Sequence, residues 1–333
     1  MTTRRHDVLG IGNAIVDILA RADDDFLVAQ NVHKGAMQLV DEARAEALYA
    51  AMGPAIVMSG GSAANTIAGL ASLGGSGAFI GKVKTDDLGR QFAHDIRAIG
   101  IHFPTAPAAD GPATARSMIL VTPDGERTMN TYLGACQNLT PDDIDRDTVE
   151  SSGIVYLEGY LWDPPAAKEA FIKAADIAHA AGNRVAITLS DSFCVDRYRD
   201  EFLDLMRRGK LDIVFANEHE LRSLYQTADF DTAAAALRQE EVLGVVTRSE
   251  RGSLVVTRGE TLAVPAHPVT QIVDSTGAGD LFASGFLFGL ARGLDHRTCA
   301  RHGALAAAEI IQQMGPRPQR SLKALAEESG LPV

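Results

Sequence analysis

The chain alternates short apolar runs with stretches of helical periodicity, and this alternation restricts the fold more than any other feature of the sequence. Segments such as 165–181 and 199–208 carry apolar residues at helical spacing and separate the runs. Buried strands that are separated by helices predict a mostly parallel sheet with helices on its faces. The runs that we interpret as buried strands are Val8 to Ile11, Ala78 to Ile80, Ile154 to Leu157, Val185 to Leu189, Ile213 to Phe215, and Val245 to Val246.

Two regions interrupt this alternation, at about 17–40 and about 104–134. The second region contains alternating stretches at 117–122 and 127–133, which are joined by Pro123-Asp124-Gly125. Alternation on both sides of such a turn predicts a β-hairpin. We interpret both regions as strands of a small β-sheet that is inserted into the α/β body as a lid. The alternative is a long irregular excursion over the surface.

Length, charge and cysteine content exclude several classes of protein. The 333 residues are 46% hydrophobic and suit one large α/β domain, which we place at residues 1–333. The net charge of −12 argues against nucleic-acid binding, which usually needs a basic face. No apolar run approaches about 18 residues and the start lacks the apolar core of a signal peptide, so we expect no membrane contact. Cys136, Cys194 and Cys299 lack CxxC spacing, which favours a reducing cytoplasm without disulfides.

The strongest indication of chemistry is a glycine-containing turn between a β-branched stretch and an apolar helix, with the sequence Asp274-Ser275-Thr276-Gly277-Ala278-Gly279-Asp280. The two glycines let successive N–H groups point the same way, and the following helix adds the positive end of its dipole. Such a turn is suited to holding a phosphate in transfer. Asp280 falls in the first helical turn, where an ionised carboxylate accepts the proton of an attacking hydroxyl. The alternative is an acidic residue that only caps the helix.

Residues 274–280 closely resemble the C-terminal signature of the PfkB family, which includes ribokinase, fructokinase and adenosine kinase. The resemblance implies a ribokinase-like three-layer α/β sandwich with a mostly parallel central sheet and a small β-sheet lid. It also implies that the backbone of 277–279 forms an anion hole and that Asp280 is the catalytic base. Asp274 and Thr276 match part of the family's monovalent-cation site, so K⁺ is an expected ligand. The alternative for Asp274 is a cap at a strand end.

Other segments extend the resemblance over almost the whole chain. Gly60, Gly61 and Asn65 lie in a segment that resembles the family's Gly-Gly motif, Gly60-Gly61-Ser62-Ala63-Ala64-Asn65. The resemblance implies that the glycines admit a sugar against the backbone and that Asn65 bonds its hydroxyls. Two glycines before a helix are otherwise a common turn.

Two short motifs match the family's sites for ATP. Asn217 and Glu220 resemble the NxxE motif, which implies that they help to place Mg²⁺ and phosphates through water. A helix N-cap is the alternative, and the two roles are compatible. Thr247, Arg248 and Gly252 match the family's nucleotide-phosphate loop. For Arg248, an ordinary surface position is the alternative.

The N-terminal run that contains Asn13 and Asp17 resembles adenosine kinases, in which this Asp binds ribose through vicinal hydroxyls. The same resemblance places Arg127 on the lid, where it reaches the transferred phosphate. Thr188 and Leu161 depart from adenosine kinases, which have Asn and a stacking aromatic residue there; a different base, looser specificity or a sugar would explain this. The resemblance gives four apolar residues as the wall of the base pocket, Leu39, Met129, Leu161 and Phe193, although each also fits ordinary core.

Together these motifs predict an ATP-dependent kinase that phosphorylates a ribose hydroxyl of a nucleoside, with the 5′-hydroxyl of adenosine as the leading acceptor and purine salvage as the setting. The alternatives are a fructokinase- or ribokinase-like sugar kinase and a non-catalytic nucleoside sensor. An intact 276–280 argues against the sensor, because binding alone does not need the base. The expected ligands are ATP, Mg²⁺, K⁺ and the acceptor, and the chain is expected to be a monomer or a homodimer.

Two other nucleotide-binding motifs do not match. A dinucleotide-binding loop that began at Gly10 would need a third glycine where Ile15 stands. A Walker A loop that ended at Gly81-Lys82 would need a glycine at position 76, which is Ser76.

Overall fold

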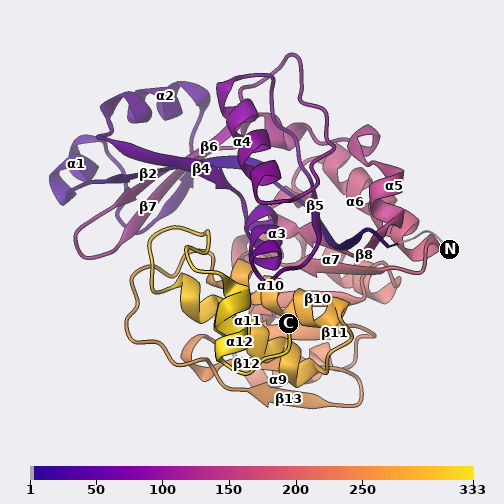
Figure 1. Ribbon diagram of the computed structural model, residues 1–333. Coiled ribbons are helices and arrows are strands. Elements are labelled where there is room, and N and C mark those ends of the chain that lie inside the picture. The colour runs from indigo at the N-terminus through magenta and orange to yellow at the C-terminus, as the bar shows by residue number, and fades with distance from the viewer. Residues whose placement is uncertain (1–3) are drawn as a thin grey trace.

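The computed structural model describes residues 4–333, which form a large sheet with a smaller sheet beside it (Figure 1). The large sheet has the strand order β13-β12-β11-β10-β9-β8-β1-β5. Neighbouring strands from β5 to β11 are parallel, whereas β12 and β13 pair antiparallel at one edge. All six apolar runs predicted as buried strands lie in its parallel part. Its strands are β1 (His6–Ile11), β5 (Gly77–Ile80), β8 (Ser152–Glu158), β9 (Arg184–Thr188), β10 (Ile213–Asn217), β11 (Leu243–Thr247), β12 (Ser253–Val256) and β13 (Thr261–Val264).

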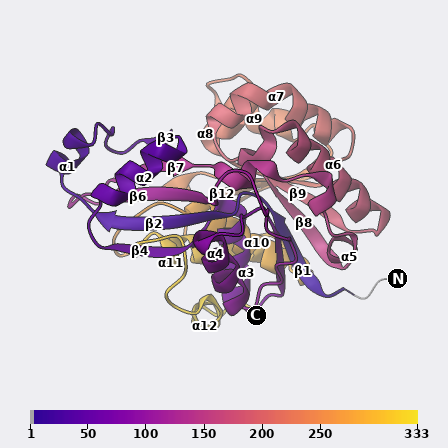
Figure 2. The ribbon, with the colours of Figure 1, turned by 90° about the horizontal axis from the view of Figure 1, so that it is seen from above.

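Helices cover both faces of the large sheet, as Figure 2 shows, so the predicted three-layer α/β sandwich is confirmed. One apolar core joins the sheet to helices α3, α4, α10, α11 and α12, and a second joins it to α5 through α9. The first group comprises α3 (Ser62–Ser72), α4 (Asp87–Ala98), α10 (Ala278–Ala291), α11 (His296–Ile310) and α12 (Leu322–Glu328). The second comprises α5 (Arg146–Glu150), α6 (Pro165–Ala180), α7 (Ser192–Arg207), α8 (Glu218–Leu224) and α9 (Phe230–Leu237).

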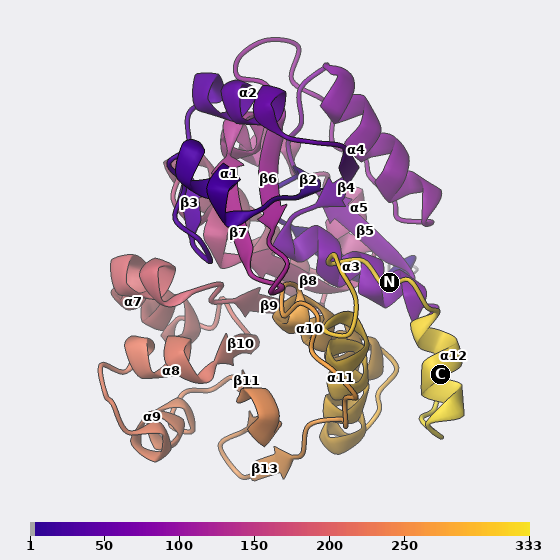
Figure 3. The same cartoon turned by 90° about the vertical axis from the view of Figure 1, so that its left-hand side faces the viewer.

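The smaller sheet has five strands in the order β3-β7-β6-β2-β4. Helices α1 (Asp24–Ala29) and α2 (Glu42–Ala51) cover its outer face through a separate apolar cluster, and Figure 3 shows α2 above the sheet. Strand β4 lies outside the two regions that we predicted as strands of the lid, 17–40 and 104–134. Helix α1 lies inside the first of these regions, where we predicted only strands. The strands are β2 (Ile15–Arg21), β3 (Met37–Leu39), β4 (Ala55–Gly60), β6 (Ala115–Val121) and β7 (Arg127–Tyr132).

In the described part of the chain, four short 3₁₀ helices connect these elements: η1 (Gly134–Asn138), η2 (Pro141–Asp143), η3 (Gly159–Trp162) and η4 (Ser249–Arg251). The three cysteines are buried and unpaired. Within residues 4–333, no helix combines the length and the apolar character that a membrane crossing requires.

Candidate active site

A cavity of about 600 Å³ lies between the inner face of the small sheet and the carboxyl ends of β8 to β11. This edge of a parallel sheet is where open α/β folds usually bind ligands. The predicted site residues that line the cavity are Asn13, Asp17, Leu39, Gly61, Asn65, Met129, Phe193, Asn217, Glu220, Thr247, Thr276, Gly277, Ala278, Gly279 and Asp280. Those that do not line it are Gly60, Arg127, Leu161, Arg248, Gly252 and Asp274.

The turn before α10 presents backbone N–H groups to this cavity. Gly277 caps the helix in the left-handed region, with φ of 80°, which glycine adopts without strain. The carboxylate of Asp274 accepts a hydrogen bond of 3.0 Å from the Thr276 N–H and thereby fixes the turn. The first N–H groups of a helix lack intrahelical partners and lie at the positive end of its dipole. Residues 277–279 can therefore hold an anion.

Asp280 lies in the first turn of α10 and meets two side chains from α3. Its Oδ1 accepts a hydrogen bond of 2.6 Å from the Ser62 hydroxyl, and its Oδ2 accepts one of 3.1 Å from the Asn65 amide. Burial raises the pKa of Asp280, whereas these two hydrogen bonds and the charge of Arg317 act in the opposite direction. Sequence analysis did not identify Ser62, although it lies inside the Gly-Gly motif.

Asp17 projects from β2 into the same cavity, beside the Gly60–Gly61 pair. A methyl group on Gly60 would overlap the Asp17 carboxylate, so glycine is needed there to admit this side chain. Gly61 has φ of 97°, and a methyl group on it would overlap the Asn13 carbonyl oxygen. Burial raises the pKa of Asp17 to about 7, and the charges of Arg317 and Arg127 oppose that rise.

Glu158, at the end of β8, is a second buried carboxylate in the cavity, and sequence analysis missed it. Its Oε1 accepts a hydrogen bond of 2.7 Å from the Asn13 amide, and its Oε2 accepts one of 2.8 Å from the Ala63 N–H. Burial raises its pKa to about 7. Glu158 therefore connects the turn after β1 to the start of α3. The sequence offered only a polar residue at a predicted strand end.

Arg317, in the loop between α11 and α12, is a third residue that sequence analysis missed. Its guanidinium donates hydrogen bonds of 3.0 Å to the Ser59 carbonyl and 2.8 Å to the Ala64 carbonyl. Burial lowers its pKa to about 10, and Asp17 and Asp280 counteract that effect. Arg317 thus fixes both ends of the Gly-Gly turn and supplies positive charge to two cavity carboxylates.

Asn217 and Glu220 form a reciprocal cap at the start of α8. The Asn217 side chain accepts a hydrogen bond of 2.9 Å from the Glu220 N–H, and the Glu220 carboxylate accepts one of 2.9 Å from the Asn217 N–H. The N-cap interpretation is therefore confirmed, and both side chains also line the cavity. Burial raises the pKa of Glu220 to about 7. The described residues contain no group of three or more His, Cys, Asp or Glu side chains that forms a metal site by itself.

Thr247 faces the cavity, but Arg248 turns away from it. The Arg248 guanidinium lies 3.9 Å from the centre of the Phe230 ring, and its Nε is 3.2 Å from the Glu218 carboxylate. Gly252 ends the short helix η4 with φ of 83°, outside the cavity wall. In this conformation Arg248 stabilises the β11–α8 region.

Arg127 also differs from its predicted placement. Its guanidinium lies 2.6 Å from the Asp274 carboxylate in a buried ion pair, and Arg127 does not line the cavity. Asp274 additionally accepts hydrogen bonds from the Thr276 and Gly315 N–H groups. The ion pair and these two hydrogen bonds occupy the carboxylate, so the expected K⁺ site at Asp274 and Thr276 does not fit the residues around it. A guanidinium stands where the cation was expected.

The apolar wall matches the prediction at three of four positions. Leu39, Met129 and Phe193 line the cavity, and Phe193 and Leu39 are 78% and 59% exposed as residues. Leu161 is instead fully buried in the core beneath α6 and α7. The adjacent Tyr160 lines the cavity in its place and supplies the aromatic ring that the sequence had seemed to lack.

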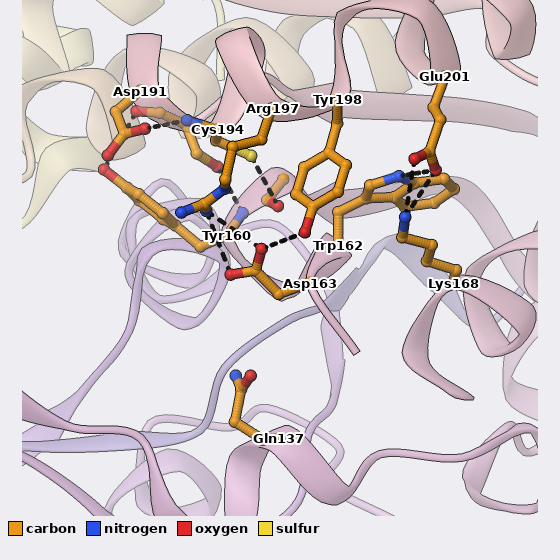
Figure 4. Close-up of polar contacts among 12 residues, drawn as sticks. Gln137, Tyr160, Trp162, Asp163, Lys168, Asp191, Cys194, Arg197, Tyr198 and Glu201 are labelled. Atoms are coloured by element: carbon orange, nitrogen blue, oxygen red, sulfur yellow. Dashed lines mark hydrogen bonds and ion pairs between the residues drawn. The ribbon is translucent and has the colours of Figure 1, made fainter. Parts of the chain in front are cut away.

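A polar network on η3 and α7 holds Tyr160 at the cavity wall (Figure 4). The Tyr160 hydroxyl donates a hydrogen bond of 3.2 Å to the Ser190 carbonyl. Asp163 forms an ion pair of 3.1 Å with Arg197 of α7. The Trp162 ring N–H donates a hydrogen bond of 2.8 Å to the carboxylate of Glu201, which is also on α7. These contacts fix the η3 turn and thus the direction of the Tyr160 ring.

Comparison with known proteins agrees with this geometry. The model of the pfkB family carbohydrate kinases matches residues 57–322. The crystal structure of adenosine kinase from Sinorhizobium meliloti is 57% identical, with a TM-score of 0.92, over 98% of this chain and 99% of that chain. A probable sugar kinase protein from Rhizobium etli CFN 42 is 54% identical, with a TM-score of 0.93, over 99% of this chain and 100% of that chain. Adenosine kinase from Saccharomyces cerevisiae is 27% identical over 92% of this chain and 95% of its own length.

Proposed function

This chain belongs to the pfkB family of carbohydrate kinases, and we propose that it transfers the γ-phosphoryl group of ATP to the 5′-hydroxyl of adenosine, which gives AMP and ADP. One observation carries the proposal. The cavity has a carboxylate at an anion-binding turn, Asp280, and a second carboxylate on the facing sheet, Asp17. The first is placed to receive a proton and the second to hold sugar hydroxyls.

The proposed reaction uses these residues in a fixed order. Asp17 and Asn65 hold the ribose hydroxyls and orient the 5′-hydroxyl toward Asp280. Asp280 takes the proton as the 5′-oxygen attacks the γ-phosphorus, and the bond from phosphorus to the bridging oxygen breaks. The N–H groups of 277–279 stabilise the charge on the transferring group. The small sheet, with the regions 17–40 and 104–134, closes over the cavity as a lid and excludes water.

A purine base suits the apolar part of the cavity. Leu39 and Met129 come from the small sheet, whereas Tyr160 comes from η3 and Phe193 from the start of α7, so a planar base would lie between two apolar surfaces. Phe193 and Leu39 are unusually exposed for large apolar side chains, which is understandable if a ligand covers them. Aromatic rings bind planar bases by stacking and edge contacts.

Mg²⁺ and ATP complete the proposed site. The oxygen-rich pair Asn217 and Glu220 fits Mg²⁺ held through water, and the ion would neutralise phosphate charge. Thr247 lies on the same side of the cavity and is positioned to contact nucleotide phosphates. We place the enzyme in a reducing cytoplasm in nucleoside salvage, consistent with its free cysteines, as a monomer or a homodimer.

A coupled assay of ADP release tests the proposal. Adenosine should support turnover with Mg·ATP, whereas ribose and fructose should support little. The 54% identity to a protein described as a probable sugar kinase makes a sugar the specific second candidate. Turnover with fructose or ribose and none with adenosine would establish that candidate. Adenosine that raises the melting temperature without any ADP release would indicate a nucleoside sensor.

A further inference from the structure

The proposed base accepts a hydrogen bond from a hydroxyl group of the protein itself. Ser62 is the first residue of α3, and its Oγ donates a hydrogen bond of 2.6 Å to Oδ1 of Asp280. The second oxygen of Asp280 accepts from Asn65. The Ser62 O–H therefore has the same relation to the base that an acceptor alcohol needs.

Ser62 also lies beside the anion-binding turn. Helices α3 and α10 pack against each other, and the first residues of both helices line the same cavity. Ser62 is only partly buried, and the cavity continues from it to residues 277–279. Two hydroxyl groups could therefore reach a phosphoryl group that is held at that turn beside Asp280. One is the hydroxyl of the acceptor, and the other is the hydroxyl of Ser62.

We propose that Ser62 is a phosphorylation site, modified by the enzyme itself when Mg·ATP is bound and the acceptor position is empty. This inference rests on the proposed kinase function. The Ser62 oxygen attacks the γ-phosphorus, and a new bond from oxygen to phosphorus forms. The bond between phosphorus and the bridging oxygen breaks, and ADP leaves with that electron pair. The hydroxyl proton passes to Asp280 and then to solvent. ATP is the only co-reactant, and no redox change occurs.

The product should be stable and inactive. A phosphoserine at Ser62 would stand at the N-terminus of an 11-residue helix, where a negative charge of about −1.5 to −2 is favourable. It would also separate Asp280 from any acceptor. A bound acceptor prevents the reaction, because its own hydroxyl occupies Asp280 and consumes the γ-phosphoryl group. A bound acceptor thus protects Ser62 from phosphorylation by ATP, the enzyme's other substrate.

Mass spectrometry of the intact protein tests this proposal. The full chain is incubated with Mg·ATP alone and is then assayed for adenosine turnover. We expect incorporation to approach one phosphoryl group per chain, located on the peptide that contains Ser62, with activity falling in proportion. Adenosine held at ten times its Kd by continuous replenishment, with ATP regenerated, leaves about one site in eleven empty and should slow incorporation about tenfold.

Two variants identify the reacting groups. Asp280→Asn should incorporate no phosphate, which also excludes a contaminating kinase. Ser62→Ala should remain unmodified, and whatever activity it has should survive the incubation that inactivates the wild type. If Ser62→Ala does not fold, Asp280→Asn and protection by adenosine still decide the question.

The outcomes separate this inference from the proposed function. An enzyme that phosphorylates adenosine but shows no phosphate on Ser62, or shows phosphate on another residue, overturns the inference alone. Absence of turnover with every nucleoside and sugar would overturn the proposed function instead. Phosphate on Ser62 that persists in Asp280→Asn would show that the modification does not depend on the enzyme's own base and would likewise overturn the inference alone.

Discussion

Replacing Arg317 with methionine removes a positive charge that acts on Asp17 and Asp280 while keeping an unbranched side chain of similar length. An opposite charge within about 4–6 Å lowers a carboxylate pKa by about 1–3 units, so the loss of the Arg317 charge should raise the pKa of both carboxylates, and that of Asp17 by about one unit. The pKa of Asp17 is already about 7. At pH 7 its ionised fraction would then fall from about one half to about one tenth, so kcat/KM should fall about fivefold.

The pH dependence of kcat/KM tests this prediction. These carboxylates act when ionised, so activity is lost as pH falls through their pKa, and a raised pKa moves that loss to higher pH. In Arg317→Met, the acidic limb of kcat/KM should move up by about one pH unit, and activity should approach the wild-type value near pH 9. Arg317→Lys is the matched control, because it keeps the charge but not the planar fork that bonds Ser59 and Ala64. It should keep the wild-type midpoint with a lower melting temperature. An Arg317→Met profile that is lower at every pH but has an unchanged midpoint would refute the electrostatic argument.

Three further predictions concern single residues in or beside the cavity. Asp280→Asn should lower kcat by about 10²–10⁴-fold, with adenosine still raising the melting temperature as in the wild type; near-normal ADP release would exclude Asp280 as the base. Gly60→Ala places a methyl group against the Asp17 carboxylate and should raise KM for adenosine more than tenfold. The control Gly53→Ala, whose new methyl group meets nothing within 4 Å, should leave KM unchanged. Tyr160→Ala should weaken adenosine binding with little loss of stability. Leu161→Ala should lower the unfolding free energy by about 2–5 kcal/mol, while the folded fraction keeps its affinity for adenosine. If Tyr160→Ala lost stability and Leu161→Ala lost adenosine affinity instead, our placement of the purine ring would be contradicted.

Local patterns in the sequence were sufficient for most of the fold. The parallel strands are continuous apolar runs because helices cover both of their faces, and that pattern can be read without tertiary information. Strand β4 was not predicted, because it is an edge strand whose pairing with β2 joins distant segments. The exchange of Leu161 for Tyr160 has a similar cause. The 3₁₀ turn at 159–162 decides which of two adjacent side chains faces the cavity, and sequence spacing does not specify that direction.

The site residues that were missed depend on contacts between distant segments. Arg317 bonds Ser59 across 258 positions of the chain, and no local pattern marks an arginine in a loop as a partner of a glycine turn. The ion pair between Arg127 and Asp274 likewise joins the small sheet to the anion-binding turn. Each residue had a family role when taken alone, and only their packing shows that in this conformation they neutralise each other.

The charge of the cavity favours a neutral acceptor over its phosphorylated product. Burial raises the pKa of Asp17 and of Glu158 to about 7, and it also raises the pKa of Asp280. The nearby positive charge therefore does not fully offset the cost of burying these carboxylates in their ionised form. A nucleoside adds no charge and leaves that balance unchanged. AMP adds a dianion beside Asp280, where the guanidinium of Arg317 already serves two carboxylates. The desolvated carboxylates that we propose to hold ribose and to accept its proton therefore act against retention of the product, in opposition to the anion-binding turn at 277–279, which attracts its phosphate.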